Sequence, residues 1–376
     1  MKILIINDFI VEYGGPEKGI IIKKKFFEGK GHSVELFGSK KIIRNKFTIL
    51  NFKYYFKLKK KIREFKPDLI LIHNIRFFLS PLILFALPKS IPKIITIHDY
   101  GNICPKIWNI DEDKQVCKRG IGFRCIYKKC LSSKKRNIFY EFLRYLKVNF
   151  LNYSIIKKVD IIITPSKLLS KKIRTKFKLT NVFTIRNPQK LIRNQYINKG
   201  KYYLYVGRLE KEKGIFFLLK NFQLFLNKFP KEKLIIIGDG KIKKEIKKYI
   251  EINNLKKNII IKDFMTFDNL HQYYFNAKCV LVPSIWVENF SNVVLESLID
   301  RTPLLVNLIG GLKEQSKIFL NVNTYKYNNS IDFIKKLEYC QNTKKKSFKK
   351  DLELIKKDFS LEKYYNEIIK HYNKIN

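Results

Sequence analysis

Two glutamates in the segment 282–297 have a spacing that suits binding of a polar ligand. In its sequence, VPSIWVENFSNVVLES, Glu288 follows a predicted strand and Glu296 comes eight positions later. If a helix begins near Ser291, its free N–H groups can receive a phosphate or a sugar oxygen, and Glu296 faces the same cleft. Because two carboxylates near an anion site are electrostatically costly, we expect them to bind hydroxyl groups or a developing positive charge. Either residue alone could equally be a capping carboxylate or a surface glutamate.

Two cations follow another predicted strand, 202–207, in the sequence GRLEKEKGI. Arg208 comes directly after the strand and Lys213 five residues later. If a helix starts near Glu212, both cations can lie over the end of the sheet, where an Arg fork and a Lys point charge suit a diphosphate. The alternative is a pair of solvated cations in a lysine-rich chain.

Glycine-containing turns follow two further strands. Gly14 and Gly15 precede a helix after the first strand, and Gly238 and Asp239 end another strand. Glycine lets a backbone approach a ligand closely, and the second turn can pass close to a base or a ribose. Neither a GxGxxG nor a Walker A sequence is present, so nothing supports a dinucleotide or P-loop site.

These residues require a scaffold of strands alternating with helices, which indicates an α/β protein with parallel sheets. Ile, Leu and Val run almost continuously through the strands, as in strands buried on both faces. The predicted strands are 2–8, 33–38, 68–74, 93–99, 161–166, 182–186, 202–207, 233–239, 258–264, 279–284 and 303–307.

The strands form two series separated by a polar stretch near 187–200, so we predict two Rossmann-like halves joined by a linker. Ligands in such sheets bind outside the carboxyl ends of the strands, where the residues above lie. The last segment, 359–375, has a helical apolar repeat with Ser360 as its candidate cap.

The ordered motifs resemble those of retaining glycosyltransferases of family 4, which have the GT-B fold. GRLEKEKG, IGDG, PSIWVENFSNVVLES and IGGLKE resemble the donor-binding half of that family. The first half agrees through its glycine-rich loop and the sequences HN (73–74), TIHDY (96–100), TPS (164–166) and RNP (186–188). The resemblance implies an acceptor-side domain over 1–190, a donor-binding domain over 200–358, and a helix over 359–376 that crosses back to the first domain.

The resemblance also implies roles for individual residues. The residues implied in catalysis are Glu288 at the transferred sugar, Arg208 and Lys213 at the leaving diphosphate, and His98 reaching the donor sugar from the first domain. The residues implied in donor binding are Gly14, Gly15, Gly238, Asp239, Glu296 on the ribose, and the backbone amides of Phe290, Ser291 and Asn292. Ser291 stands where the family usually has Gly, and its Cβ could narrow the sugar pocket.

The implied reaction is transfer of a sugar with retention, in which the enzyme stabilises a departing diphosphate. A helix N-terminus with Arg and Lys can do this without Mg²⁺, and the one Asp-x-Asp sequence, Asp111 to Asp113, does not follow a strand directly. We therefore expect no catalytic metal or cofactor. The expected donor is a UDP- or GDP-sugar, and the expected acceptor a glycan or lipid-linked saccharide of cell-surface polysaccharide synthesis. A GT-B phosphorylase or epimerase is the nearest alternative.

A loop over 102–131 contains four cysteines, Cys104, Cys117, Cys125 and Cys130. Four thiolates can hold a structural zinc ion, and a loop of this length without secondary structure usually needs something to hold it. The alternative is reduced thiols packed as small apolar groups.

The chain has 376 residues with 77 Lys and Arg against 32 Asp and Glu, a net charge of +45. Such a charge attracts polyanions, although A/T-rich codon usage would also explain the lysines. A non-catalytic nucleic-acid binder is therefore an alternative, but no RRM, KH or helix-turn-helix signature supports it.

The helix-like stretch 134–159 combines apolar and basic residues and could lie on an anionic membrane; the alternative is a core helix with one solvated face. No signal peptide or membrane-spanning run is recognised, so we expect a cytoplasmic protein that can bind the membrane peripherally.

Overall fold

A computed structural model describes residues 1–11, 15–41, 50–105, 107–111, 116–127, 138–189, 200–342 and 347–375. The chain divides into two compact units. Unit 1 comprises Met1–Pro188 and Phe359–Asn376, and unit 2 comprises Gln189–Asp358. Each unit contains one parallel six-stranded sheet surrounded by helices, so the predicted α/β architecture with two Rossmann-like halves is confirmed.

The sheet of unit 1 has the strand order β2-β1-β3-β4-β5-β6, and all neighbouring pairs are parallel. Its central strands are buried along almost their whole length and consist mainly of Ile and Leu, as expected for strands with helices on both faces. The strands are β1 (Lys2–Phe9), β2 (Ser33–Ser39), β3 (Leu69–Ile72), β4 (Lys93–Thr96), β5 (Ile161–Thr164) and β6 (Val182–Thr184).

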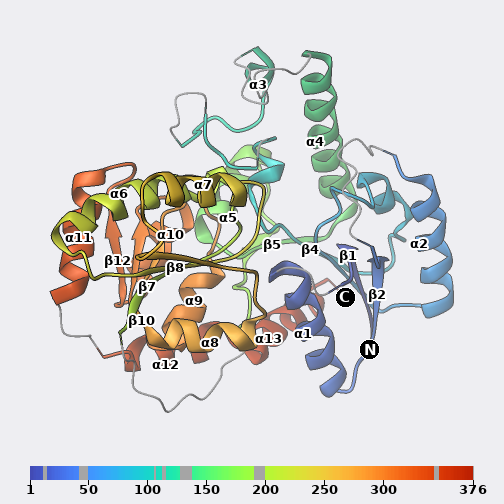
Figure 1. The fold of residues 1–376 in the computed structure, drawn as a ribbon. Coiled ribbons are helices and arrows are strands. Elements are labelled where there is room, and N and C mark those ends of the chain that lie inside the picture. Colours follow the sequence, from blue (N-terminus) through green and yellow to red (C-terminus); the bar gives the residue numbers. More distant parts are fainter. Residues whose placement is uncertain are drawn as a thin grey trace. The chain divides into compact units, whose positions relative to one another are not determined.

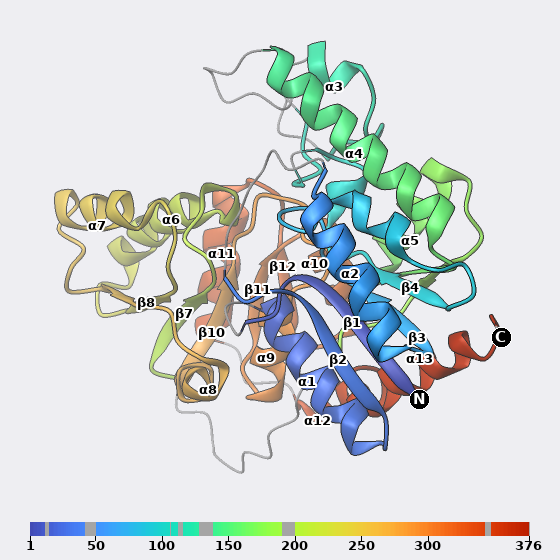
Figure 2. The same ribbon diagram turned by 90° about the vertical axis from the view of Figure 1, so that its right-hand side faces the viewer.

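Helices of unit 1 follow almost every strand. They are α1 (Gly15–Gly29), α2 (Phe52–Phe65), α3 (Arg124–Tyr127), α4 (Ile138–Lys158), α5 (Lys167–Phe177) and α13 (Leu361–Tyr372), with the 3₁₀ helices η1 (Pro81–Ala86) and η2 (Tyr100–Asn102). Helix α13 comes from the far end of the chain and packs beside α1, as Figure 1 and Figure 2 show. The Ser360 hydroxyl accepts from the Lys363 N–H at 3.1 Å, which confirms the predicted cap.

The sheet of unit 2 has the strand order β12-β11-β10-β7-β8-β9 and is also parallel throughout. Its strands are β7 (Tyr202–Val206), β8 (Leu234–Ile237), β9 (Ile259–Lys262), β10 (Ala277–Val282), β11 (Leu304–Asn307) and β12 (Val322–Tyr325). Its helices are η3 (Lys211–Lys213), α6 (Ile215–Lys228), α7 (Lys243–Ile252), α8 (Phe267–Asn276), α9 (Asn292–Ile299), α10 (Gly310–Ile318), α11 (Ser330–Asn342) and α12 (Lys349–Asp358).

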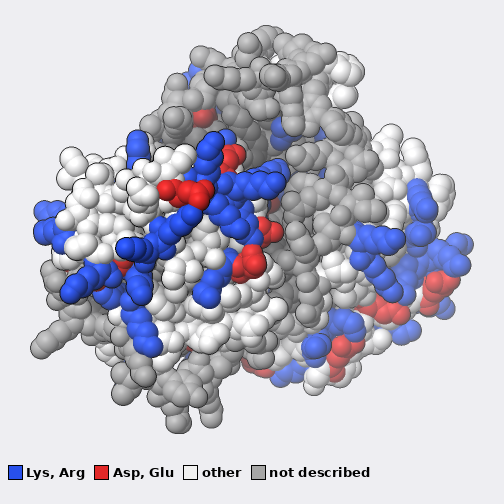
Figure 3. Space-filling model, viewed as in Figure 1, with Lys and Arg blue, Asp and Glu red and all other residues white. Residues whose placement is uncertain are grey.

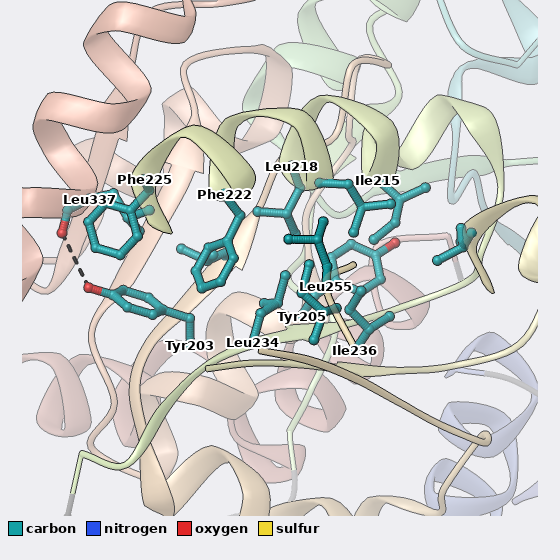
Figure 4. Close-up of a cluster of buried hydrophobic side chains, with 14 of the residues drawn as sticks. Tyr203, Tyr205, Ile215, Leu218, Phe222, Phe225, Leu234, Ile236, Leu255 and Leu337 are labelled. Atoms are coloured by element: carbon teal, nitrogen blue, oxygen red, sulfur yellow. Dashed lines mark hydrogen bonds between the residues drawn. The ribbon is translucent and has the colours of Figure 1, made fainter. Parts of the chain in front are cut away.

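The core of unit 2 fixes the positions of β7 and β8, whose loops carry candidate site residues. Figure 4 shows apolar side chains of α6 lying over Tyr203, Tyr205 and Leu234 of these strands. The Tyr203 hydroxyl, at one end of this apolar cluster, donates to the Leu337 carbonyl oxygen at 3.4 Å. The buried phenol is thereby satisfied, as a buried polar group must be.

The structure differs from the predictions at three places. Strand β12 was not predicted, because its sequence VNTY is short and half polar. The helix expected near Glu212 is only the 3₁₀ turn η3; the α-helix begins at Ile215, since Gly214 between them is left-handed (φ 73°). The cysteine loop contains α3 and an isolated bridge between Ile110 and Val116, although it was expected to lack secondary structure.

Part of the predicted linker, 190–199, and the start of the basic stretch, 134–137, lie outside the described residues. The remainder of that stretch is α4, a helix as predicted. Within the described ranges, no helix combines the length and the apolar content needed to cross a bilayer.

Candidate functional site

The sheet order of unit 2 brings together two loops that are far apart in sequence. Strands β7 and β10 are neighbours, so the loop after β7 lies beside the loop after β10. The Ile285 N–H donates to the Glu212 carbonyl oxygen at 3.0 Å. A Cβ on Gly214 would lie 1.9 Å from the Pro283 carbonyl oxygen, so only glycine permits this approach. The two loops therefore form one structure at the carboxyl end of the sheet.

Lys213 and Glu288 meet where these loops join. The Lys213 Nζ lies 2.6 Å from Glu288 Oε1, and the Ser284 hydroxyl donates to the same oxygen at 2.8 Å. The ammonium also lies 4.5 Å from the centre of the Trp286 ring. The side chains of Lys213 and Glu288 are only 17% and 10% exposed, so two candidates with separately predicted roles form one largely buried ion pair.

The surroundings of Glu288 keep its carboxylate ionised. Burial acts to raise the pKa of Glu288, but the charge of Lys213 and hydrogen bonds that include those from Lys213 and Ser284 outweigh burial. The pKa of Glu288 therefore lies below its ordinary value of 4.5. At neutral pH the site contains a carboxylate paired with an ammonium group.

Helix α9 begins immediately after this loop, with Ser291 at its N-cap, which confirms the predicted helix start. The neighbouring helix α10 holds the junction. Gln315 donates to the Ser291 carbonyl oxygen at 2.9 Å and accepts from the Ser291 N–H at 3.0 Å. The Gly311 N–H donates to the Glu288 carbonyl oxygen at 2.7 Å. Of the amides expected to bind the donor, that of Ser291 is therefore already occupied.

Glu296 lies in the second turn of α9 and is half-buried. Its carboxylate accepts from the Tyr274 hydroxyl of α8 at 2.8 Å. Burial and the neighbouring Glu296 raise the pKa of Tyr274 well above 10, so the phenol stays protonated and remains a donor. The bond fixes one carboxylate oxygen of Glu296 and is a contact that the sequence did not indicate.

Arg208 lies outside the Lys213–Glu288 pair. Its side chain is 54% exposed, and its Nη2 lies 3.9 Å from Glu212 Oε1. The turn with Gly238 and Asp239 lies beside it, because a Cβ on Gly238 would be 1.9 Å from the Gly207 carbonyl oxygen. The Asp239 side chain is 67% exposed and 3.4 Å from the Lys243 ammonium. These groups form an exposed charged rim and contrast with the buried pair.

His98 lies in unit 1, in a small pocket at the carboxyl ends of β3 and β4. Its Nε2 is 3.0 Å from Nδ1 of His73, and the rings are stacked. Burial, aided by the charges of Lys23 and Arg76, lowers the pKa of His98 to about 3, although Asp99 acts in the opposite direction. His98 is therefore neutral at physiological pH. Its predicted role at a donor sugar stays a prediction.

Three further residues organise this pocket; the sequence did not single out Asp8 and Arg76, and it gave His73 only as part of the HN sequence. Asp8 accepts from the N–H groups of residues 77, 78 and 79 at 2.7, 3.0 and 2.8 Å and so fixes the loop after β3. Arg76 in that loop forms an ion pair with Asp99. His73 holds His98, as described above. The HN sequence placed His73 after a strand, but only the fold shows its pairing with His98.

The remaining predicted residues are placed only in part. Gly14 lies outside the described residues, and Gly15 begins α1. In the cysteine loop, Cys104 is buried, Cys117 and Cys125 are half-buried, and Cys130 is outside the described residues. Among the residues that can be placed, no group of three or more His, Cys, Asp or Glu side chains could hold a metal ion. Zinc binding stays a prediction, which elemental analysis of purified protein would test.

Comparisons with known families cover both units. Residues 22–189 match the model described as glycosyltransferase family 4, and residues 188–357 match the model described as glycosyl transferases group 1. The boundary between the two matches coincides with the boundary between the units.

The individual proteins to which the chain is similar share low sequence identity with it or match only part of it. An uncharacterized glycosyltransferase of Methanocaldococcus jannaschii is 28% identical over 69% of the chain, which spans 59% of that relative's length. A Campylobacter jejuni enzyme is 36% identical over 27% of the chain and 26% of its own length. Its name describes a 4-alpha-N-acetylgalactosaminyltransferase acting on a diphospho-undecaprenol-linked saccharide. The crystal structure of Anabaena HepE with UDP and glucose has a similar fold (TM-score 0.68, 15% identity, 99% of both chains).

Proposed function

Because the chain belongs to the group 1, or family 4, glycosyltransferases with the GT-B fold, we propose that it transfers a sugar, with retention, from a nucleotide sugar to a saccharide acceptor. Unit 2 would bind the donor. The observation that carries this proposal is the buried Lys213–Glu288 pair next to the start of α9. The pair places a cation and a carboxylate at the carboxyl end of a Rossmann-like sheet, where donor diphosphate and sugar would meet.

The geometry supports a division of labour in the donor site. Lys213 would exchange part of its contact with Glu288 for the diphosphate as negative charge develops on the leaving group. Glu288 would then be free to contact the transferred sugar. Arg208, on the exposed rim, would reach the diphosphate from its other side. Glu296, fixed through one oxygen by Tyr274, would accept hydroxyl groups of the ribose with the other.

The relatives indicate which ligands to try first. The HepE structure contains UDP, and the name of the Campylobacter enzyme includes a lipid-linked acceptor. We propose a UDP-sugar as donor, with a GDP-sugar as the alternative, and a glycan or lipid-linked saccharide as acceptor. A thermal-shift series with UDP- and GDP-sugars would identify the donor, because a ligand that binds the folded state raises the unfolding temperature. No catalytic metal is proposed, so EDTA should leave transfer unchanged.

Steady-state kinetics of Lys213→Met with the identified donor test the proposal. Removal of one group that stabilises developing charge typically lowers kcat by about 10²–10³-fold, with a smaller effect on donor affinity. Glu296→Ala should mainly weaken donor binding, because the ribose is remote from the bond that breaks. Lys220→Met, on the exposed face of α6, is the matched control and should keep wild-type kinetics. A wild-type rate in Lys213→Met would place the active site elsewhere.

The same assay separates the alternatives. A phosphorylase would need free phosphate as co-substrate, and an epimerase would convert the nucleotide sugar without any acceptor. A non-catalytic polyanion binder would neither transfer nor hydrolyse a nucleotide sugar.

A further inference from the structure

Helix α2 exposes large apolar side chains that it does not need for packing. It buries Leu58 and Ile62 against unit 1, which is the normal apolar stripe of a surface helix. Phe52 and Phe56, one turn apart, are nevertheless 56% and 63% exposed, and Leu50 before the helix is 50% exposed. A helix that only faces water gains nothing from two phenylalanines on its outer side.

The outer side of α2 is also strongly basic. Its exposed cations are Lys53, Lys57, Lys59, Lys60 and Arg63. At 100° per residue, Lys59, Lys60 and Arg63 project from the same side as the two phenylalanines. The one acidic residue of the helix, Glu64, is 3.7 Å from the Lys60 ammonium. Figure 3 shows Lys and Arg gathered over the part of unit 1 where α2 lies, with Asp and Glu along the lower edge of this region.

Helix α4 has a second exposed apolar stripe. Its large exposed side chains recur at intervals of three, four or seven residues and so lie along one side of the helix. They are Phe139, Phe142, Leu146, Tyr153 and Ile156, with exposures of 62%, 39%, 42%, 53% and 41%. Both α2 and α4 pack against η1, so the two helices contact the same element of unit 1.

We infer that α2 and α4 form the surface by which this protein lies on a lipid bilayer with anionic headgroups. Phenylalanines among lysines suit the interface, because the rings enter the acyl boundary while the ammonium groups stay with the headgroups. Pure electrostatic attraction, as expected for nucleic acid, would need the cations but not the exposed rings. The inference is independent of the donor site in unit 2, because vesicle binding is measured without a nucleotide sugar.

Cosedimentation of the full chain with vesicles tests the electrostatic part. The protein should bind vesicles of phosphatidylglycerol and phosphatidylcholine, bind far less to phosphatidylcholine alone, and dissociate as salt rises. Lys59→Glu/Arg63→Glu, on the side of the two phenylalanines, should weaken binding about tenfold or more. Lys244→Glu/Lys248→Glu on the exposed face of α7 changes the net charge equally and should bind like wild type. Equal losses in both variants would overturn the assignment of this surface.

A second pair of variants tests insertion. Phe52→Ser/Phe56→Ser and, separately, Phe142→Ser/Leu146→Ser should each weaken binding several-fold at constant charge. The control Ile252→Ser/Ile331→Ser removes apolar side chains that are 67% and 83% exposed in unit 2 and should have no effect. Unchanged binding of both phenylalanine variants would refute insertion. Binding to duplex DNA through the same cations, with no binding to vesicles, would show instead that this surface recognises nucleic acid.

Discussion

The contact between Lys213 and Glu288 sets both the chemistry and the stability of the candidate site. The structure shows a largely buried pair, and removal of one partner leaves the other charge without its counter-charge in a dry environment. Loss of activity in a single variant must therefore be read together with its stability.

Protonation of Glu288 should lower the free energy of unfolding as the pH falls below 4.5. Its folded-state pKa is lowered, so the unfolded chain binds the proton more tightly. The stabilisation is complete above pH 4.5 and is lost as pH falls through the folded-state pKa. The free energy of unfolding, measured with denaturant between pH 3.5 and 7, should fall less steeply with decreasing pH in Glu288→Gln than in wild type. The exposed Glu353→Gln is the control, and identical slopes for Glu288→Gln and wild type would contradict the linkage.

The buried charge of Lys23 in α1 should make unit 1 less stable at neutral pH than an uncharged side chain at this position would. The side chain is 3% exposed, its ammonium lies 4.3 Å from the centre of the Tyr364 ring, and burial lowers the pKa of Lys23 to about 7. The penalty is complete below pH 7 and fades as pH rises toward 10.5, the ordinary pKa of lysine.

Lys23→Met should therefore raise the unfolding free energy at pH 7 by an amount on the order of a few kcal/mol, and by much less at pH 10. Urea unfolding at both pH values would measure the difference. Lys24→Met, in a more exposed ion pair with Glu28, is the matched control. A gain that is equal at both pH values would show that packing, not charge, is responsible.

Among the secondary-structure elements, α10 determines how α9 begins. Gln315 is fully buried and bonds both the N–H and the carbonyl group of Ser291. The side chain thus occupies backbone groups that a helix N-terminus would otherwise offer to a ligand. This crosslink from α10 to the start of α9 holds the loop that contains Glu288.

Gln315→Ala should destabilise unit 2 by about 2–4 kcal/mol, because two buried backbone groups lose their partners and a cavity forms. Donor binding should weaken as well, since the Glu288 loop loses its support. Thermal unfolding and a donor titration would measure both effects. Gln315→Glu keeps an acceptor for the Ser291 N–H and should be intermediate; a fully stable Gln315→Ala would show that the crosslink is dispensable.

At the scale of the whole molecule, the end of the chain belongs to the first unit. Tyr364 and Ile368 of α13 are buried in the core that also contains Ile3 and Leu71 of the unit 1 sheet. A unit that draws its core from both ends of the chain can complete its packing only after the other unit has been synthesised.

Removal of residues 359–376 should therefore destabilise unit 1 selectively, because it opens the apolar face under α13. Hydrogen exchange should become faster in the strands from β1 to β6 and change little in those from β7 to β12. Removal of 374–376 alone is the control, since it leaves α13 complete. Equal exchange in the two truncated chains would show that unit 1 does not need α13.

The sequence alone determined the α/β class, the division of the chain into two units and most of the strands, because each of these depends on local features. Runs of Ile and Leu identify strands buried on both faces, and glycines and polar residues at their ends identify the loops. The cap at Ser360 was also predictable, since capping is a property of neighbouring residues, and the start of α9 near Ser291 was expected from the local sequence as well. Strand β12 was missed because VNTY has no such apolar run.

The tertiary structure decided which of the candidate residues meet. Lys213 and Glu288 are 75 positions apart and touch because β10 lies beside β7, an order that no local pattern encodes. His73 and His98 meet for the same reason, at neighbouring strands β3 and β4. Ser291 is held by Gln315 through the packing of two helices. Strand order and side-chain pairing follow from how the whole core closes, so the sequence identified the chemical groups and the fold decided their partners.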